Sequence, residues 1–205
     1  MAARHLDTPG WESAVFIDKA INDCSLLNID ADASGNAIAL WSQNNHDELW
    51  TNRHESGAGW QAPKQLSSGA YIQSFTSKFD ASANAIALWV QESTVGYELC
   101  GARNTLGRGW NAPSQISSRN DVAFPSLAVD AHGDAIAAWA GDRISVIRYT
   151  PGLGWGTPEA VTSTAGYGYS KVLIAMDPMG RITLLFSELS HTDTHYCAIK
   201  AMRFE

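Results

Sequence analysis

The sequence contains one short group of potential metal ligands, "HTDTH" at residues 191–195. His191, Asp193 and His195 are spaced two apart, so an extended chain would place all three side chains on one face. Imidazole nitrogens together with a carboxylate oxygen form a donor set suited to a transition metal such as zinc. The motif is short and occurs once, and a polar hairpin tip would explain it equally well. We therefore expect no cofactor, with a metal ion bound by these three residues as the alternative.

Carboxylates that could catalyse glycoside hydrolysis are present but not visibly paired. Such an enzyme needs two carboxyl groups on opposite sides of a cleft. The candidates are Asp47, Glu48, Glu92, Asp121 and Glu188. The sequence has no Gly-x-Ser-x-Gly, no phosphate-binding glycine loop and no His-Glu-x-x-His, so the patterns of other enzyme classes are missing. We therefore expect no catalytic residues and a protein that is not an enzyme.

Aromatic residues close to polar ones fit another chemistry, the recognition of sugars or protein loops. An aromatic plane offers apolar contact area, and nearby charged or amide groups fix the orientation of a ligand. The predicted ligand-binding residues are Trp50, Tyr71, Arg119, Asp121, Tyr167 and Tyr169. The alternative is that these residues belong to ordinary solvated loops.

The elements that would position these residues are written four times. "DASGNAIALW" at 32–41 returns as "DASANAIALW" at 80–89, as "DAHGDAIAAW" at 130–139 and, more weakly, as "DPMGRITLLF" at 177–186. A Gly-Trp pair recurs every 45 to 50 residues, at Trp11, Trp60, Trp110 and Trp155. This period is typical of propellers. Each repeat divides into four segments of strand length, here called a, b, c and d, and none has a helical period.

The repeated residues are interpreted as scaffold. An aspartate that opens a turn accepts hydrogen bonds from amides further along, and the fourth position tolerates a positive φ when it is glycine. Asp32, Asp80, Asp130 and Asp177 are therefore predicted turn residues, and Ala83 in place of glycine predicts a strained turn. The seven tryptophans at repeat positions are predicted core, namely Trp11, Trp41, Trp60, Trp89, Trp110, Trp139 and Trp155. The arginines of the c segments are predicted to bond these turns. Function should then lie in the b–c and d–a loops, which vary among the repeats.

The fold class that follows is all-β, a β-propeller of four blades with four antiparallel strands each. The predicted blades of this single domain are residues 24–66, 74–116, 123–161, and 168–205 together with 11–17. The N-terminal strand is expected to join the last blade beside residues 195–204 and to close the ring of blades, because this pairing removes two exposed edges. The alternatives are two chains that together form eight blades and a piece of a longer array.

Composition excludes several classes of partner. The chain has 205 residues and a formal net charge of −7 with no basic cluster, which argues against nucleic acid. No apolar run approaches the roughly 20 residues of a membrane span. The first residues lack the apolar core of a signal peptide, and the compartment stays unknown from the residues alone. An odd count of three cysteines predicts thiols, mostly buried, rather than a disulfide framework.

The pattern D-x-x-G-N-A-I-A-x-W, followed by an arginine and by G-x-G-W-x-x-P, is similar to a repeat of mostly uncharacterised, exported bacterial proteins. These proteins are identified as β-propellers of a broadly sialidase-like, Asp-box-related kind. The similarity covers nearly the whole chain and is strongest from 32 to 161. The chain departs from the true Asp-box, Ser-x-Asp-x-Gly-x-Thr-Trp, and the sialidase arginine triad with its tyrosine nucleophile cannot be placed. The resemblance implies a propeller, a secreted or cell-surface location and surface recognition.

We therefore expect a non-catalytic module that binds a glycan in the manner of a lectin, or a protein or peptide, through the variable loops. A monomer or a small homo-oligomer is expected. The alternatives are a glycoside-processing enzyme of sialidase-like fold and a structural or assembly repeat.

Overall fold

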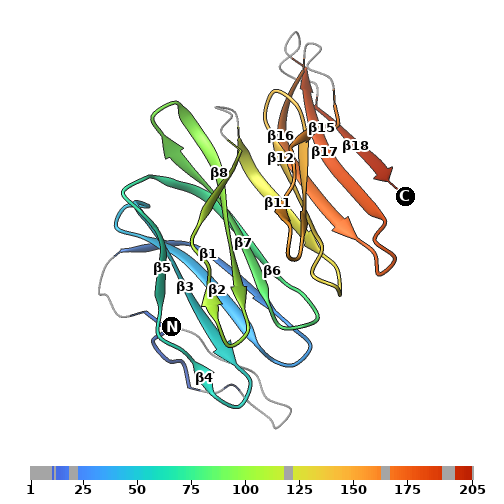
Figure 1. The fold of residues 1–205 in the computed structure, drawn as a ribbon. Coiled ribbons are helices and arrows are strands. Elements are labelled where there is room, and N and C mark those ends of the chain that lie inside the picture. Colours follow the sequence, from blue (N-terminus) through green and yellow to red (C-terminus); the bar gives the residue numbers. More distant parts are fainter. Residues whose placement is uncertain are drawn as a thin grey trace.

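The structure is a computed structural model that describes residues 11, 13–18, 23–117, 122–162, 167–190 and 197–204. These residues form 18 strands in four antiparallel sheets and no helix, which confirms the predicted all-β class. Figure 1 shows the sheets following one another in chain order, from the N-terminal sheet at the lower left to the C-terminal sheet at the upper right. Within the described part of the chain there is no helix that could cross a membrane.

Each sheet corresponds to one repeat. The first sheet contains β1 (Cys24–Ala31), β2 (Ala37–Gln43), β3 (Glu48–Glu55), β4 (Gly59–Trp60) and β5 (Lys64–Ser68). The second contains β6 (Ile72–Phe79), β7 (Ala85–Ser93), β8 (Gly96–Thr105), β9 (Gly109–Trp110) and β10 (Ser114–Ser117). The third contains β11 (Ala123–Val129), β12 (Ala135–Ala140), β13 (Ser145–Thr150), β14 (Gly154–Trp155) and β15 (Glu159–Ala160). The fourth contains β16 (Tyr167–Met176), β17 (Ile182–Ser190) and β18 (Cys197–Phe204).

The outer segment d is split into two short strands in the first three sheets. The break falls at Pro63, Pro113 and Pro158. Proline has no N–H to donate to a ladder, so the pairing with the c strand stops before it and resumes after it. In the first sheet, for example, both β4 and β5 pair with β3.

The repeated aspartates form the predicted turns between the a and b strands. Asp32 Oδ1 accepts hydrogen bonds from the amides of Ser34 at 2.8 Å and Asn36 at 3.0 Å. The same pattern recurs at Asp80, Asp130 and Asp177. The non-glycine residue Ala83 has a φ of 57°, a left-handed conformation that strains a residue with a Cβ.

Neighbouring sheets pack face to face, and each junction joins the tryptophan face of one sheet to the opposite face of the sheet before it. The tryptophan face of a sheet is the one that carries Trp41, Trp89, Trp139 or Phe186, and the opposite face carries Leu40, Leu88, Ala138 or Leu185. Trp89 and Ala87 of the second sheet share an apolar cluster with Leu40 and Leu49 of the first. Similar clusters join the second sheet to the third and the third to the fourth. Trp41, Trp89 and Trp139 are buried, as predicted. Trp60, Trp110 and Trp155 are half-buried, and Trp11 is 72% exposed, so the core prediction is wrong for Trp11.

The arginines of the c strands differ among the repeats. Arg103 Nη2 donates to Asp80 Oδ2 at 2.6 Å, as predicted. Arg53 instead reaches the next turn, where its Nη2 donates to the carbonyl oxygen of Ala83 at 2.8 Å. Arg148 lies exposed. Arg103 therefore bonds the turn of its own sheet and Arg53 that of the next sheet, and Arg148 reproduces neither contact among the interactions described.

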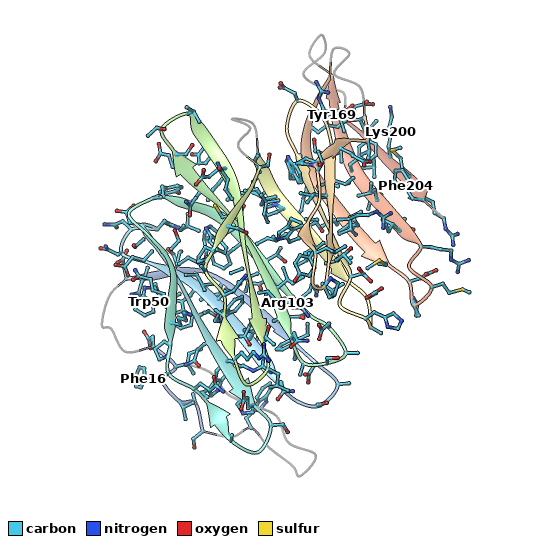
Figure 2. All side chains as sticks on the ribbon, in the orientation of Figure 1. Phe16, Trp50, Arg103, Tyr169, Lys200 and Phe204 are labelled. Atoms are coloured by element: carbon cyan, nitrogen blue, oxygen red, sulfur yellow. The ribbon has the colours of Figure 1, made fainter. Side chains whose placement is uncertain are left out.

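The predicted closure of the ring of blades does not form among the described residues. The carbonyl oxygen of Ile17 accepts a hydrogen bond from Asn52 Nδ2 of β3 at 2.8 Å, so the N-terminal segment lies on the first sheet. Figure 2 shows Phe16 and Phe204 at opposite ends of the molecule. The N-terminal segment thus lies over part of the tryptophan face of the first sheet. It leaves Leu27 82% exposed and Ile29 65% exposed on that face.

The cysteines fit the prediction in part. Cys100 is buried, and neither Cys24 nor Cys100 forms a disulfide. Burial, followed by the negative charge of Glu98, raises the pKa of the Cys100 thiol to about 12. Cys24 is exposed, because it pairs with Gln43 on the tryptophan face of the first sheet, which no other described sheet covers.

Candidate functional site

A largely part-buried chain of hydrogen bonds occupies the b–c end of the first two sheets. In the first sheet Trp41 Nε1 donates to Gln43 Oε1 at 3.1 Å, and Gln43 Nε2 donates to Glu48 Oε2 at 3.1 Å. In the second, Trp89 Nε1 donates to Gln91 Oε1 at 2.7 Å, and Gln91 Nε2 donates to Glu98 Oε1 at 2.8 Å. An indole, an amide and a carboxylate thus satisfy one another in the same order in both sheets.

Neutral donors favour the ionised form of Glu48. Trp50 Nε1 also donates to Glu48 Oε2, at 2.7 Å. The hydrogen bond from Trp50, followed by that from Gln43, lowers the pKa of Glu48 from its ordinary value. A donor to the charged form favours that form. In the first two sheets the arrangement therefore serves as a fixed part of the scaffold.

The fourth sheet replaces this arrangement with reactive groups. Phe186, Ser187 and Glu188 stand where Trp41, Ser42 and Gln43 stand in the first sheet. A carboxylate has therefore replaced the central amide. Tyr169 Oη donates to Glu188 Oε1 at 3.5 Å, and Lys200 Nζ forms an ion pair with Glu188 Oε2.

Local strand geometry explains why these groups meet. Tyr169 of β16 pairs with Glu188 of β17, and the register then shifts between Tyr169 and Lys171. Such a bulge re-aims a side chain near the end of a strand, here toward the tryptophan face. Lys200 of β18 pairs with Phe186, so its side chain lies on the same face. Figure 2 shows Tyr169 and Lys200 close together on the fourth sheet.

These groups line a recess of about 370 Å³. Its lining residues are Thr162, Tyr169, Phe186, Glu188, Lys200, Ala201 and Met202. Ligand sites of a few hundred Å³ accept a small organic molecule such as one sugar unit. Glu188 and Tyr169 are each only 9% exposed, whereas Lys200 is half exposed. Chemically, the carboxylate can accept the phenolic proton while the ammonium group balances its charge.

The predicted ligand-binding residues fall into separate regions. Trp50 is half-buried in the first sheet, and the exposed Tyr71 packs against the imidazole of His46, with ring centroids 5.2 Å apart. Tyr169 lies in the recess and packs edge-on against Phe186 at 5.8 Å. Figure 2 places Trp50 and Tyr169 at opposite ends of the molecule. The structure therefore does not bring Trp50 together with Tyr169.

Several predicted residues are not placed by the structure. Arg119, Asp121, His191, Asp193 and His195 lie outside the described residues. The backbone of Tyr167 pairs with Ser190, and its side chain lies outside the described part. Among the described residues there is no group of three or more His, Cys, Asp or Glu side chains that could hold a metal ion. Metal binding by "HTDTH" stays a prediction.

The contacts of Glu188 with Tyr169 and Lys200 were not predicted from the sequence. One signal was available, because "FSE" at 186–188 aligns with "WSQ" at 41–43 and "WVQ" at 89–91. A glutamine that recurs in register and then becomes a glutamate marks a change in chemistry. The contact between Tyr169 and Glu188 could not be predicted from the sequence, since it depends on the bulge in β16.

No protein family profile matches the sequence, and no curated protein matches it. Solved structures do resemble the fold. The intramolecular trans-sialidase of Ruminococcus gnavus is 14% identical, with a TM-score of 0.54 over 86% of this chain and 42% of its own. The α-L-arabinanase of Penicillium chrysogenum, solved with arabinobiose, is 13% identical, with a TM-score of 0.57 over 91% and 64%. A protein of unknown function from Dyadobacter fermentans is 12% identical, with a TM-score of 0.59 over 99% and 71%.

These likenesses support the predicted propeller fold, since the sialidase and the arabinanase are propeller proteins. The chain spans less than two thirds of the length of both enzymes. They also correct the expectation that the protein is not an enzyme. Several of the solved structures that resemble this fold are glycoside-processing enzymes, which contradicts that expectation.

Proposed function

We propose that this chain is a glycoside-processing propeller that binds an oligosaccharide at the recess lined by Tyr169, Glu188 and Lys200. The observation that carries the proposal is the change from amide to carboxylate at Glu188, beside a phenol and an ammonium group. The residues around it line a recess of sugar-unit size. The propeller fold shared with a sialidase and an arabinanase supports the same substrate class.

In this proposal Tyr169 is the nucleophile and Glu188 its base. Glu188 accepts the phenolic proton as Tyr169 Oη bonds to the anomeric carbon. The bond from that carbon to the leaving-group oxygen breaks, and this oxygen takes the proton from Glu188. Water then bonds to the anomeric carbon, the bond to Tyr169 Oη breaks, and a proton from the water returns to Tyr169. A tyrosine nucleophile is an established exception to the usual pair of carboxylates in glycosidases. Lys200 pairs with Glu188 Oε2 and leaves Oε1 to the phenol of Tyr169.

The position of the recess supports this assignment. Glu188 lies near the end of β17, and Tyr169 near the start of β16, so both belong to the end of the sheet that carries the b–c and d–a loops. Those loops vary among the repeats, and loops on a rigid scaffold are the usual place for specificity. A secreted or cell-surface location, which the resemblance implies, would bring the chain into contact with such glycans.

The test is turnover of chromogenic sialosides, arabinosides and other glycosides by the chain and by Glu188→Gln. The substitution keeps the shape and installs the amide of the first two sheets. We expect a loss of at least about 100-fold in kcat/KM, the usual contribution of a positioned base. Tyr169→Phe should abolish turnover, because the ring is kept and the nucleophilic oxygen is lost.

The matched control is Glu92→Gln, which changes an exposed glutamate of β7 and should leave turnover unchanged. Absence of turnover on every glycoside, or equal turnover by Glu188→Gln and the unchanged chain, would overturn the proposal. Binding on a glycan array without turnover would identify a lectin instead.

A further inference from the structure

We infer that the two end sheets form an interface for a second copy of this chain, in which the first sheet of one copy packs on the fourth sheet of the other. The interface would repeat the contact already made three times inside the molecule. At every internal junction, the tryptophan face of one sheet lies on the opposite face of the sheet before it. The first sheet has its tryptophan face uncovered by another sheet, and the fourth has its opposite face uncovered (Figure 1).

The exposed residues on the two end faces match each other. Leu27 and Ile29 lie exposed on the first sheet. On the fourth sheet, Leu173, Leu185 and Ile199 are 49%, 43% and 67% exposed. Exposed apolar side chains that gather on one face of a protein mark an interaction surface. The end faces are therefore unlike the surface of a finished monomer.

The equivalence extends to individual positions. Leu27 pairs with Trp41 as Phe75 pairs with Trp89. Leu185 precedes Phe186 as Leu40 precedes Trp41. Leu40 and Phe75 belong to one apolar cluster at the junction of the first two sheets. Leu185 of one copy would meet Leu27 of the other in the same way.

The N-terminal segment already occupies the place that this interface requires. Leu66, Ile116 and Val161 each follow a Gly-Trp tryptophan by six residues. Each packs into the cluster that joins its sheet to the next one. Ile17 follows Trp11 by six residues and contacts Asn52, the equivalent of Ala102 in the cluster with Leu66. Residues 13–18 thus lie on the first sheet, in the place that segment d of a preceding blade would take.

The strand that would complete that blade is available on the fourth sheet. In the first three sheets the c strand pairs with segment d, whereas among the described residues β18 pairs with β17 alone. Figure 2 shows that the N-terminal segment of the same chain is too far away, since Phe16 and Phe204 lie at opposite ends. A second copy can supply the segment to β18, and its β1 would then lie beside β16.

Two copies joined in this way close without leaving an end. The contact is heterologous, and two such contacts related by a two-fold axis give a closed ring. Eight sheets fall within the usual range of 4–8 blades. No exposed apolar face and no unpaired edge would remain at either junction.

The experiment measures oligomeric state with paired variants. Native mass spectrometry and analytical ultracentrifugation, at about 1 to about 100 μM protein, should show twice the 22.1 kDa chain mass. Leu27→Lys and Leu185→Glu should each give a monomer, because each places a charge against an apolar face at both junctions. Leu153→Glu is the control; it changes an exposed leucine of the turn between β13 and β14 and should stay dimeric.

Mixing the two monomeric variants supplies the decisive result. In the mixed dimer one junction is unchanged and the other pairs the new lysine with the new glutamate, so a dimer should return. Hydrogen exchange should show protected amides in β18 of the dimer and at least tenfold faster exchange in either monomeric variant. A monomer at all concentrations, dimeric single variants, an open polymer, or a mixture that stays monomeric would overturn the inference.

Discussion

The first two sheets and the fourth sheet use the b–c end of the tryptophan face for different purposes. In the first two, an indole, a glutamine and a glutamate form a closed chain of hydrogen bonds. In the fourth, a phenylalanine, a glutamate and a lysine take the positions of Trp41, Gln43 and Trp50, and Tyr169 joins them from β16. The difference lies in hydrogen bonding: a glutamine side chain can donate and accept at once, whereas an ionised glutamate side chain can only accept.

This difference has a physical consequence for reactivity. A buried polar chain in which every group has a partner rigidifies the core and leaves nothing to react. Glu188 is 9% exposed and is balanced by the half-exposed Lys200. A carboxylate that lines a recess can meet a ligand there. A repeat scaffold can therefore acquire a site by exchanging one amide for a carboxylate.

The largest expected effect comes from removing the indole of the second sheet. Trp89 is 1% exposed, and its Nε1 donates to Gln91. Trp89→Ala should lower the free energy of unfolding by about 3–5 kcal/mol, the usual cost of deleting a large buried aromatic side chain. Urea denaturation followed by circular dichroism measures it.

The control for this prediction is Trp60→Ala. Trp60 is half-buried and packs edge-on against His54 at 5.4 Å, so its loss should cost clearly less. A Trp89→Ala protein with the stability of the unchanged chain would contradict the core role of the repeated tryptophans, and the contrast between the sheets would fail with it.

A smaller effect is expected from breaking the chain at its centre. Gln91→Leu keeps the volume but leaves the indole N–H of Trp89 without its acceptor and removes a donor from Glu98. An unsatisfied buried polar group costs about 1–3 kcal/mol. Thermal and urea denaturation should both show the loss.

Gln115→Leu provides the comparison, since Gln115 Nε2 donates to Glu98 Oε2 at 2.6 Å in an exposed position. Water can replace that donor, so the variant should lose less stability than Gln91→Leu. Equal losses would mean that burial of the chain is not what distinguishes the second sheet.

Much of the scaffold was predictable from sequence because it depends on local chemistry. The turns at Asp32, Asp80, Asp130 and Asp177 require only an aspartate followed by amides within four residues. The buried tryptophans follow from strand alternation and from the repeat itself. Ala83 was predicted to be strained and has a positive φ.

The arrangement of the ends and the recess depends on long-range geometry that no local pattern encodes. The ring of blades was expected to close within one chain because segments d and c complement each other. The curvature of the stacked sheets decides whether they can meet, and here they lie at opposite ends (Figure 1). The contact of Tyr169 with Glu188 likewise needs the bulge in β16, which moves the tyrosine onto the recess side.

The smallest expected effect concerns the charge state of Glu48 in the first sheet. Its pKa is lowered from an ordinary value of 4.5, first by the hydrogen bond from Trp50 and then by that from Gln43. A group with a lowered folded-state pKa contributes stability that is present above its unfolded pKa and lost as the pH falls through the folded value. The unchanged chain should therefore exceed Glu48→Gln in stability at neutral pH by less than about 1 kcal/mol, and the difference should shrink as the pH falls below 4.5.

Trp50→Phe keeps a ring and removes the N–H. It should bring the pH at which the stability difference disappears back toward 4.5, because the main hydrogen-bond donor to Glu48 is gone. Melting temperatures of the unchanged chain and the variants, measured from pH 7 down to about pH 3, test this prediction. A stability difference that stays constant with pH would show that neutral donors do not hold Glu48 ionised. Glu48 would then need a charged partner, as Glu188 has in Lys200.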